Sequence, residues 1–302
     1  MTDPSDRLSH PLVRQLLERC TFPPSGAAVT CAVSGGADSL ALLALAVAAG
    51  CGVDAMHVDH QLRPGSAAEA DIVRAAAARF GAEFRAVTVH VGEGSNLEAR
   101  ARAARYAALP VDTLTGHTAD DQAETVLINL LRGAGTSGIA GMRADRRRPL
   151  LALRRDDTGA LCAALDLRPV HDPSNDDPRH LRNRVRHELL PQLAHLAQRD
   201  LVPVLARQAE LARDEADLLD ELARALDPTD AKALAAAPVA LARRAVRRWL
   251  TVEHPPDAAT VERVLQVARG LTLATEVGGG ARVERHQQRL RAVGLRDSTP
   301  SE

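Results

Sequence analysis

The chain has 302 residues, 45% of them hydrophobic and 25% charged, which is long enough and apolar enough for two globular domains. Its formal net charge of −1 at pH 7 excludes a uniformly basic nucleic-acid-binding protein, so any contact with RNA must use a local patch. The four cysteines form no CxxC pair, which argues against a disulfide framework, a zinc site or an iron–sulfur cluster.

Strand and helix patterns alternate along the first half of the chain. After a short amphipathic helix at 10–20, apolar runs predict strands and patterns of period 3.6 predict helices. We expect strands at 27–33, 53–58, 83–89, 111–115 and 150–153, and helices at 39–49, 66–80, 96–109, 119–131 and 156–167. This alternation predicts an α/β fold with a parallel sheet and helices on both faces, in which ligands bind at the carboxyl ends of the strands.

The second half of the chain is predicted to be mostly helical. A helix at 179–195 precedes further helices to about residue 270, and a Gly-Gly-Gly turn within 271–293 predicts a small hairpin. We therefore expect a nucleotide-binding domain at 1–195 and a smaller helical domain at 196–302. The apolar run at 40–49 is too short to cross a membrane and no secretory leader pattern opens the chain, so we expect a cytoplasmic protein.

The first chemical motif lies between the first strand and the helix that follows it: Ser34–Gly35–Gly36–Ala37–Asp38–Ser39. A glycine-rich turn at a helix N-terminus binds anions, because the free N–H groups and the helix dipole favour phosphate. No Lys-Ser/Thr pair follows the glycines, so this is not a Walker A loop. Asp38 would repel a phosphate unless a cation lay between them, and we therefore predict that it holds Mg²⁺.

Polar side chains also follow the second and third strands. His57 and Asp59 end the second strand, and Arg63 lies shortly after it. On the helix after the third strand, Arg102 and Arg105 share a face because they are three residues apart. A functional site and a solvated, salt-bridged helix face are both compatible with that spacing.

A dense group of acids and one imidazole opens the helix at 119–131. Asp121 and Glu124 share a face, Asp120 precedes them, and His117 lies just before the helix. Acids in a first turn also stabilise the helix dipole, which is the structural alternative. The position of the group after a strand favours a functional site.

The most basic stretch follows the sequence DPSNDD and reads RNRVRHELLP. An arginine-rich helix is usually a solvated surface, but in a chain that is otherwise neutral a phosphate-contacting surface is equally well supported. The candidate residues for contact with nucleic-acid phosphate in this stretch are Arg182, Asn183, Arg184, Arg186 and His187.

In this order, SGGADS, HVDHQLR, GHTADDQAET, RGAG…GIAGM, RPLL and RNRVRHELLP closely resemble the tRNA(Ile)-lysidine synthetases of the PP-loop ATP pyrophosphatase superfamily. The resemblance covers about residues 27–191 and is only general beyond them. It implies ATP-dependent ligation of L-lysine to C2 of the wobble cytosine in the CAU-anticodon isoleucine tRNA, through an adenylylated cytosine. The segment between Tyr106 and Gly116 is shorter than in the family, and the chain resembles a short form without a further C-terminal domain.

The resemblance also implies roles for individual residues. ATP would bind to residues 34–39 and His57, with Mg²⁺ on Asp38, and residues 196–302 would add contacts to the tRNA. A lysine amine, with a pKa of ~10.4, needs a carboxylate to orient it and take a proton. The catalytic residues would be Asp38, Asp59, Arg63, Arg102, Arg105 and Asp121, with the arginines neutralising the α-phosphate. The lysine-binding residues would be His117, Asp120, Asp121 and Glu124. The assembly state, monomer or homodimer, stays open.

Three other functions stay open as alternatives. A PP-loop tRNA thiolase acting on cytidine generally needs a CxxC pair, and a PP-loop synthetase for small molecules, such as NAD synthetase, does not share HVDHQLR and RNRVRHELLP. An RNA-binding module without activity is the third. The intact acids Asp38, Asp59, Asp120, Asp121 and Glu124 argue against it.

Overall fold

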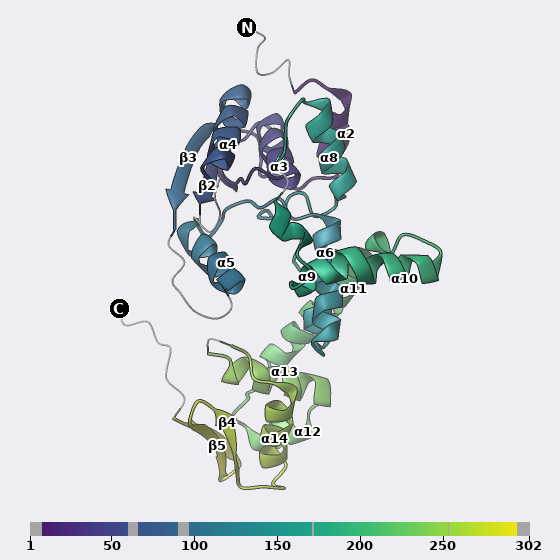
Figure 1. Ribbon diagram of the computed structural model, residues 1–302. Coiled ribbons are helices and arrows are strands. Elements are labelled where there is room, and N and C mark those ends of the chain that lie inside the picture. The colour runs from purple at the N-terminus through teal and green to yellow at the C-terminus, as the bar shows by residue number, and fades with distance from the viewer. Residues whose placement is uncertain (1–7, 60–65, 90–96, 171, 253, 295–302) are drawn as a thin grey trace. The chain divides into compact units, whose positions relative to one another are not determined.

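The computed structural model describes residues 8–59, 66–89, 97–170, 172–252 and 254–294 (Figure 1). The chain forms two compact units, Met1–Leu211 and Ala212–Glu302, and the long helix α11 (Val202–Arg224) runs through the boundary between them. The assignment of a catalytic domain to 1–195 and a tRNA-contacting domain to 196–302 stays a prediction. No helix in the described parts of the chain is long and apolar enough to cross a membrane.

The first unit contains a parallel sheet with the strand order β1-β2-β3, which confirms the predicted α/β class (Figure 1). The strands are β1 (Ala28–Ala32), β2 (Gly52–Asp59) and β3 (Glu83–Thr88). Next to β1, Leu114 forms a single parallel bridge with Cys31. The predicted strand at 111–115 is therefore reduced to one bridging residue, because a turn closed by the bond from Thr113 N to Pro110 O precedes it.

The predicted strand at 150–153 is wrong. This segment forms consecutive turns, in which Leu151 N donates to Arg148 O and Leu153 N donates to Leu150 O. Leu150 and Leu153 are fully buried, so the apolar run reflects core packing and not strand pairing.

The core of this unit forms around the helix α3 (Ala37–Ala48), which packs on β1, β2, α2 (Pro11–Leu17) and α8 (Arg155–Ala164). Residues 39–46 of α3 are all buried, because neighbouring elements cover the helix on every side. Full burial of one leucine side chain contributes about 1.5–3 kcal/mol. This packing fixes the first turn of α3, which follows the glycine-rich loop.

The helix α3 connects β1 to β2, and α4 (Ser66–Phe80) connects β2 to β3 and packs on both. The helix α5 (Leu97–Ala108) follows β3. The helix α6 (Ala119–Leu131) has the bounds that the sequence predicts. The segment 132–148, which follows α6, contains one short helix, α7 (Thr136–Ile139).

A 3-10 turn, η1 (Pro173–Asp176), precedes the basic segment. The predicted helix at 179–195 is α9 (Leu181–Arg184), a π-helical turn η2 (Val185–Leu189) and α10 (Leu190–Ala197). The irregular turn has a local cause, since Pro191 carries no N–H for the carbonyl four residues earlier.

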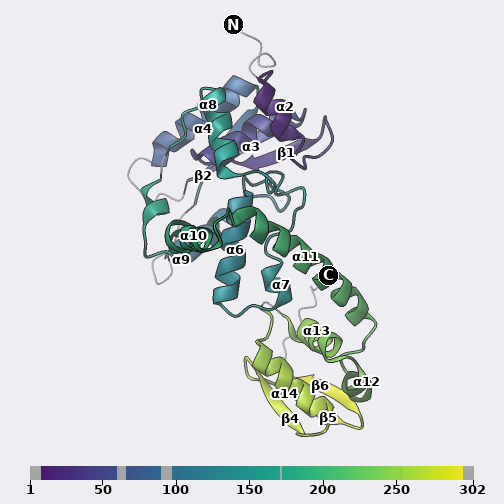
Figure 2. The same ribbon diagram turned by 90° about the vertical axis from the view of Figure 1, so that its right-hand side faces the viewer.

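The second unit combines the C-terminal part of α11 with three helices and an antiparallel sheet of order β4-β5-β6 (Figure 2). Its elements are α12 (Ala231–Ala236), α13 (Val239–Leu250), α14 (Ala258–Ala268), β4 (Ala274–Gly278), β5 (Ala281–His286) and β6 (Arg289–Val293). The helix α14 packs on β4 and β5. The predicted hairpin is thus a three-stranded meander, and its second turn uses Gln287 and Gln288, both at positive φ.

Candidate functional site

The glycine-rich loop closes on itself between β1 and α3. Ser34 N donates to Ser39 Oγ at 3.1 Å, and Ser39 Oγ donates to Gly36 O at 2.9 Å. Gly36 is the N-cap of α3 and makes no side-chain cap bond, so the helix begins without a side chain over its first N–H groups. That arrangement leaves these donors for an anion, as phosphate-binding helix N-termini do.

Two neighbouring segments approach the loop closely. A Cβ atom on Gly116 would lie 2.7 Å from the carbonyl oxygen of Asp38, so only glycine fits there. On another side, Val170 N donates to Gly35 O at 2.8 Å, and a Cβ on Gly35 would lie 3.2 Å from Val170 Cγ2. The loop is therefore held by backbone contacts from two distant parts of the sequence.

A cavity of about 590 Å³ opens at this loop. Its lining brings together residues that the sequence predicts from four separate motifs: Ser34, Asp38, His57, Arg105, His117 and Asp121. Val33, Met56 and Leu109 add an apolar part to the lining. The lining is mostly polar, with charged side chains converging on one space, which suits a small charged ligand more than an apolar one.

Asp38 lies in this cavity and is the least compensated acid of the site. Thr158 Oγ1 donates to Asp38 Oδ1 at 2.5 Å, while the Arg155 Nε atom is 3.8 Å from Asp38 Oδ2. Burial raises the pKa of Asp38 to about 6, and the charge of Asp121 adds to the rise, which the Thr158 bond and Arg155 only partly oppose. A divalent cation on Asp38 would supply the missing positive charge.

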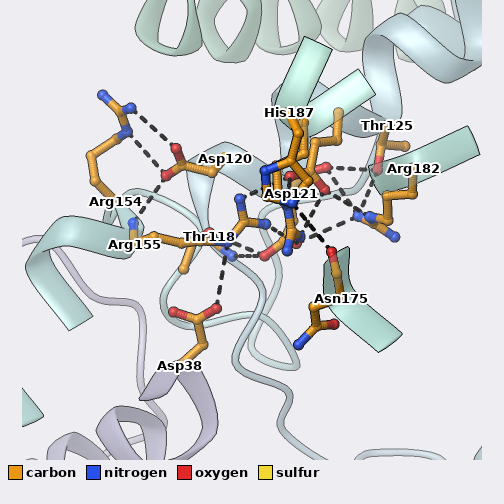
Figure 3. Close-up of polar contacts among 12 residues, drawn as sticks. Asp38, Thr118, Asp120, Asp121, Thr125, Arg154, Arg155, Asn175, Arg182 and His187 are labelled. Carbon is orange, nitrogen blue, oxygen red and sulfur yellow. Dashed lines mark hydrogen bonds and ion pairs between the residues drawn. The ribbon is translucent and has the colours of Figure 1, made fainter. Parts of the chain in front are cut away.

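Asp121 caps the helix on which it lies. Its Oδ2 atom accepts bonds from Thr118 N at 2.9 Å and Thr118 Oγ1 at 3.0 Å, and its Oδ1 atom accepts from Arg155 Nη2 at 2.7 Å (Figure 3). Burial alone would raise the pKa of Asp121, but Arg155, Arg182 and the Thr118 N–H bond hold it below its ordinary value. Asp121 is therefore ionised at neutral pH.

Glu124 is fully buried, yet it is surrounded by three guanidinium groups. It accepts bonds from Arg155 Nη1 at 2.8 Å, Arg182 Nε at 2.7 Å, and Arg186 Nε and Nη2 at 2.7 and 3.2 Å. Burial opposes ionisation, but the bond from Arg186 and the charge of Arg155 hold the pKa of Glu124 below its ordinary value. These contacts join α6, α8, α9 and η2 around one carboxylate.

Asp120 has different partners from its neighbour. It accepts from Arg154 Nε at 3.0 Å, Arg154 Nη2 at 3.1 Å and Arg155 N at 3.0 Å (Figure 3). Arg154 also pairs with Asp200. Burial opposes the ionisation of Asp120, but these bonds hold its pKa below the ordinary value. These contacts tie the start of α8 to α6. The lysine-binding role of Asp120 stays a prediction.

The predicted catalytic residues outside this cluster are placed as follows. His57 is buried, with Nδ1 3.0 Å from Val33 O, and Asp59 is half-buried at the end of β2. Arg105 lines the cavity. Arg63 lies outside the described residues, and so does the side chain of Arg102. Their predicted roles stay predictions.

The five residues predicted to bind tRNA face different ways. Arg182 and Arg186 contact Glu124, whereas Asn183 Nδ2 donates to Ser174 O at 2.8 Å and Asp177 O at 2.9 Å. The His187 Nε2 atom is 3.2 Å from Asn175 O. Arg184 is exposed, with its Nε atom 3.9 Å from Glu188 Oε2. The tRNA-binding role that the family resemblance implies for Arg182, Asn183, Arg184, Arg186 and His187 stays a prediction.

The helix predicted at 156–167 is α8, which begins at Arg155. Sequence reasoning assigned no site role to the residues at its start, yet Arg154, Arg155 and Thr158 all contact acids of the site. No local signal marks these residues, because Asp156 and Asp157 in the same first turn already offset the two arginines at the helix N-terminus. The arginines contact Asp120, Asp121 and Glu124, which lie more than 30 positions earlier in the chain.

Comparisons with known proteins agree with this geometry. The PP-loop domain family matches residues 9–193. The tRNA(Ile)-lysidine synthase of Nocardia farcinica is 43% identical over 292 residues, 91% of each chain, and that of Thermobifida fusca is 39% identical over 90% of this chain and 91% of the relative. A relative of the same name from Rhodococcus erythropolis is 46% identical over 74% of this chain and 73% of the relative.

Among solved structures, the U34-tRNA thiolase NcsA from Methanococcus maripaludis, determined with its 4Fe–4S cluster, has a TM-score of 0.53. It is 19% identical in sequence, and the match covers 67% of this chain and 78% of that chain. At this identity the likeness shows a shared fold alone.

Proposed function

The chain belongs to the tRNA(Ile)-lysidine synthase family, and from this membership we propose that it is a ligase that joins L-lysine to the wobble cytosine of a CAU-anticodon isoleucine tRNA. The observation that carries the proposal is the shared cavity. The phosphate-binding loop and the acid Asp121 line one space of about 590 Å³, so ATP and an amine can meet there. A thiolase is less favoured, because the sequence has no CxxC pair and the thiolase shares only the fold.

The first step uses ATP, which the PP-loop family consumes. The cytosine O2 atom attacks the α-phosphate and pyrophosphate leaves. Residues 34–39 would hold the departing phosphates through the N–H groups at the start of α3. Arg105 and Arg155 line the cavity and would neutralise charge that develops on the α-phosphate.

Mg²⁺ fits Asp38, whose buried carboxylate lacks a full positive partner. The described residues contain no group of three or more side chains that could hold a metal ion by themselves. Phosphate oxygens and water would therefore complete the shell, which is the usual mode for Mg²⁺ on a nucleotide. The cation would offset phosphate charge next to Asp38.

The second step transfers the lysine amine to C2 and releases AMP. Asp121 and Glu124 would orient the ammonium group, because both are ionised in the fold. Their lowered pKa values make them weak proton acceptors, so we assign proton removal to His117. Its Nδ1 atom lies 2.8 Å from Thr115 Oγ1, and the residue lines the cavity.

The tRNA itself would contact the exposed arginine Arg184 and the second unit, and the assembly state is left to measurement. Labelled lysine tests the proposed activity directly. With bulk bacterial tRNA, the protein should incorporate lysine into acid-insoluble RNA only when ATP is present. ATP–pyrophosphate exchange should in turn require tRNA. Exchange without lysine incorporation would point to another PP-loop enzyme. The absence of both exchange and incorporation would contradict the proposed catalysis.

A further inference from the structure

The carboxylate of Glu124 has no free acceptor position for an amine. Four guanidinium N–H groups point at its two oxygens, from Arg155, Arg182 and twice from Arg186. A carboxylate offers about four acceptor sites, so these contacts fill it. A lysine ammonium can therefore enter only where a guanidinium leaves.

Charge imposes the same condition. Three arginines face the two acids Asp121 and Glu124, and Glu124 is fully buried. Adding a fourth cation would leave the cluster with excess buried positive charge, while removing one without replacement would weaken the compensation of a buried acid. Exchange of one cation for another keeps the charge constant.

Arg155 is the arginine that is placed to exchange. It donates to both acids, at 2.7 Å to Asp121 Oδ1 and 2.8 Å to Glu124 Oε1, so its departure releases one oxygen of each. It also lines the cavity with the phosphate-binding loop, and its Nε atom is 3.8 Å from Asp38 Oδ2. A triphosphate in the loop would offer its guanidinium strong, bidentate partners at short range.

We propose that Arg155 exchanges partners during binding: nucleotide phosphate draws its guanidinium away from Asp121 and Glu124, and the lysine ammonium takes the two released oxygens. Nucleotide and lysine then bind with positive coupling. The coupling is reciprocal, so each ligand tightens the other by the same factor. This inference rests on the proposed function, because it assumes that lysine is the amine.

The wild-type protein provides the decisive measurement without any tRNA. The Kd of labelled lysine is measured by equilibrium dialysis with and without Mg²⁺ and α,β-methylene-ATP, which cannot be cleaved at the reacting bond. We expect binding about tenfold tighter with the nucleotide, within the usual range of coupling. The nucleotide should tighten by the same factor when lysine is present. Equal lysine affinities in both conditions, or no lysine binding in either, overturn the exchange.

Arg155→Gln removes the group that exchanges. In this variant lysine should bind without nucleotide about as tightly as it binds wild type with nucleotide, and the coupling factor should fall towards one. Arg179→Gln is the control, because that exposed arginine pairs with Asp177 and does not contact the acids. Undiminished coupling in Arg155→Gln would assign the effect to another group and contradict the proposal.

The binding and activity experiments fail separately. If wild type incorporates lysine into tRNA but shows no coupling, the exchange is wrong and the proposed function stands. If lysine binds with coupling but never enters tRNA, the function is wrong as stated.

Discussion

At the scale of single residues, the site contains acids with opposite electrostatic surroundings. Asp38 is buried with little positive charge near it, so its pKa rises to about 6, whereas the pKa of Glu124 lies below its ordinary value because arginines surround it. The two acids therefore have opposite effects on stability at neutral pH. That contrast gives a test of their roles that does not depend on the reaction.

Asp38→Asn should abolish pyrophosphate release while making the ligand-free protein more stable at pH 7. The pKa of Asp38 is raised from 3.8 to about 6, so ionisation above about pH 6 destabilises the native state, and the penalty disappears as the pH falls towards 4. The neutral amide avoids this penalty, a gain of at most about 3 kcal/mol, since each pKa unit corresponds to about 1.4 kcal/mol. Thermal unfolding at pH 4 and pH 7 measures it. A variant less stable than wild type at pH 7 would contradict the burial argument, and an active folded variant would contradict the Mg²⁺ role.

Glu124→Gln should change stability in the other direction. The lowered pKa means that Glu124 stabilises the fold above its unfolded-state pKa and that this contribution is lost as the pH falls through the folded-state value. Removing the charge leaves three arginines undercompensated, at a cost of about 3–5 kcal/mol at pH 7.

The same Glu124→Gln variant should raise the lysine concentration needed for half-maximal activity more than the ATP concentration. Steady-state kinetics with each substrate varied in turn give the comparison. Glu188→Gln is the control, because it removes an exposed acid in η2 that pairs with Arg184 and does not contact Glu124. A selective increase in the ATP requirement would move Glu124 to the nucleotide side of the site.

At the scale of elements, backbone contacts position the phosphate-binding loop. Gly116 follows Leu114, which bridges β1, and lies directly against the carbonyl of Asp38. Side-chain chemistry is absent from this contact, so its effect on ATP binding is purely geometric.

Gly116→Ala should weaken ATP binding at least tenfold while the protein remains folded. Its Cβ would lie 2.7 Å from a backbone oxygen, and the first turn of α3 must shift to admit it. Gly135→Ala is the control, because a Cβ there meets nothing within 4 Å and the backbone is not at positive φ. Nucleotide titration with both variants makes the measurement. Wild-type affinity in Gly116→Ala would show that the loop tolerates the shift.

Changing the turn between β5 and β6 should increase the stability of the protein. Gln287 and Gln288 have φ values of 44° and 66°, a geometry that hairpins usually fill with Asn-Gly. The double change Gln287→Asn and Gln288→Gly should therefore stabilise the protein by about 0.5–1 kcal/mol, since it relieves strain at positive φ. Thermal unfolding against wild type checks this, and an unchanged or lower stability would contradict the strain.

The elements that the sequence predicts well are those with a strong local signal. Residues 119–131 form α6 with the predicted bounds, because an N-terminal cap and a periodic apolar face both mark it. The Gln-Gln turn lacked the usual turn residues, so the meander was expected only as a hairpin. The apolar run at 150–153 forms turns whose leucines are buried in the core. Apolar content alone does not distinguish a buried turn from a buried strand.

The sequence predicts which motifs form the site, but it does not predict which side chains contact one another there. Asp121 and Glu124 were identified from their spacing, but the arginines that fill their acceptor positions come from segments 31 or more residues away. Such long-range pairing has no local sequence signal. Arg182 was therefore expected at a tRNA surface, while its Nε atom lies 2.7 Å from the buried Glu124.

At the scale of the whole molecule, the central claim is that one cavity first activates a cytosine and then gives lysine to it. The most direct measurement compares two transcripts of isoleucine tRNA, one with the anticodon CAU and one in which uracil replaces the wobble cytosine. Each is incubated with the protein, ATP, Mg²⁺ and labelled lysine, and digested nucleosides are analysed by mass spectrometry. We expect a lysine-bearing cytidine from the first transcript and no lysine in the second. Lysine in both, or in neither, would contradict it.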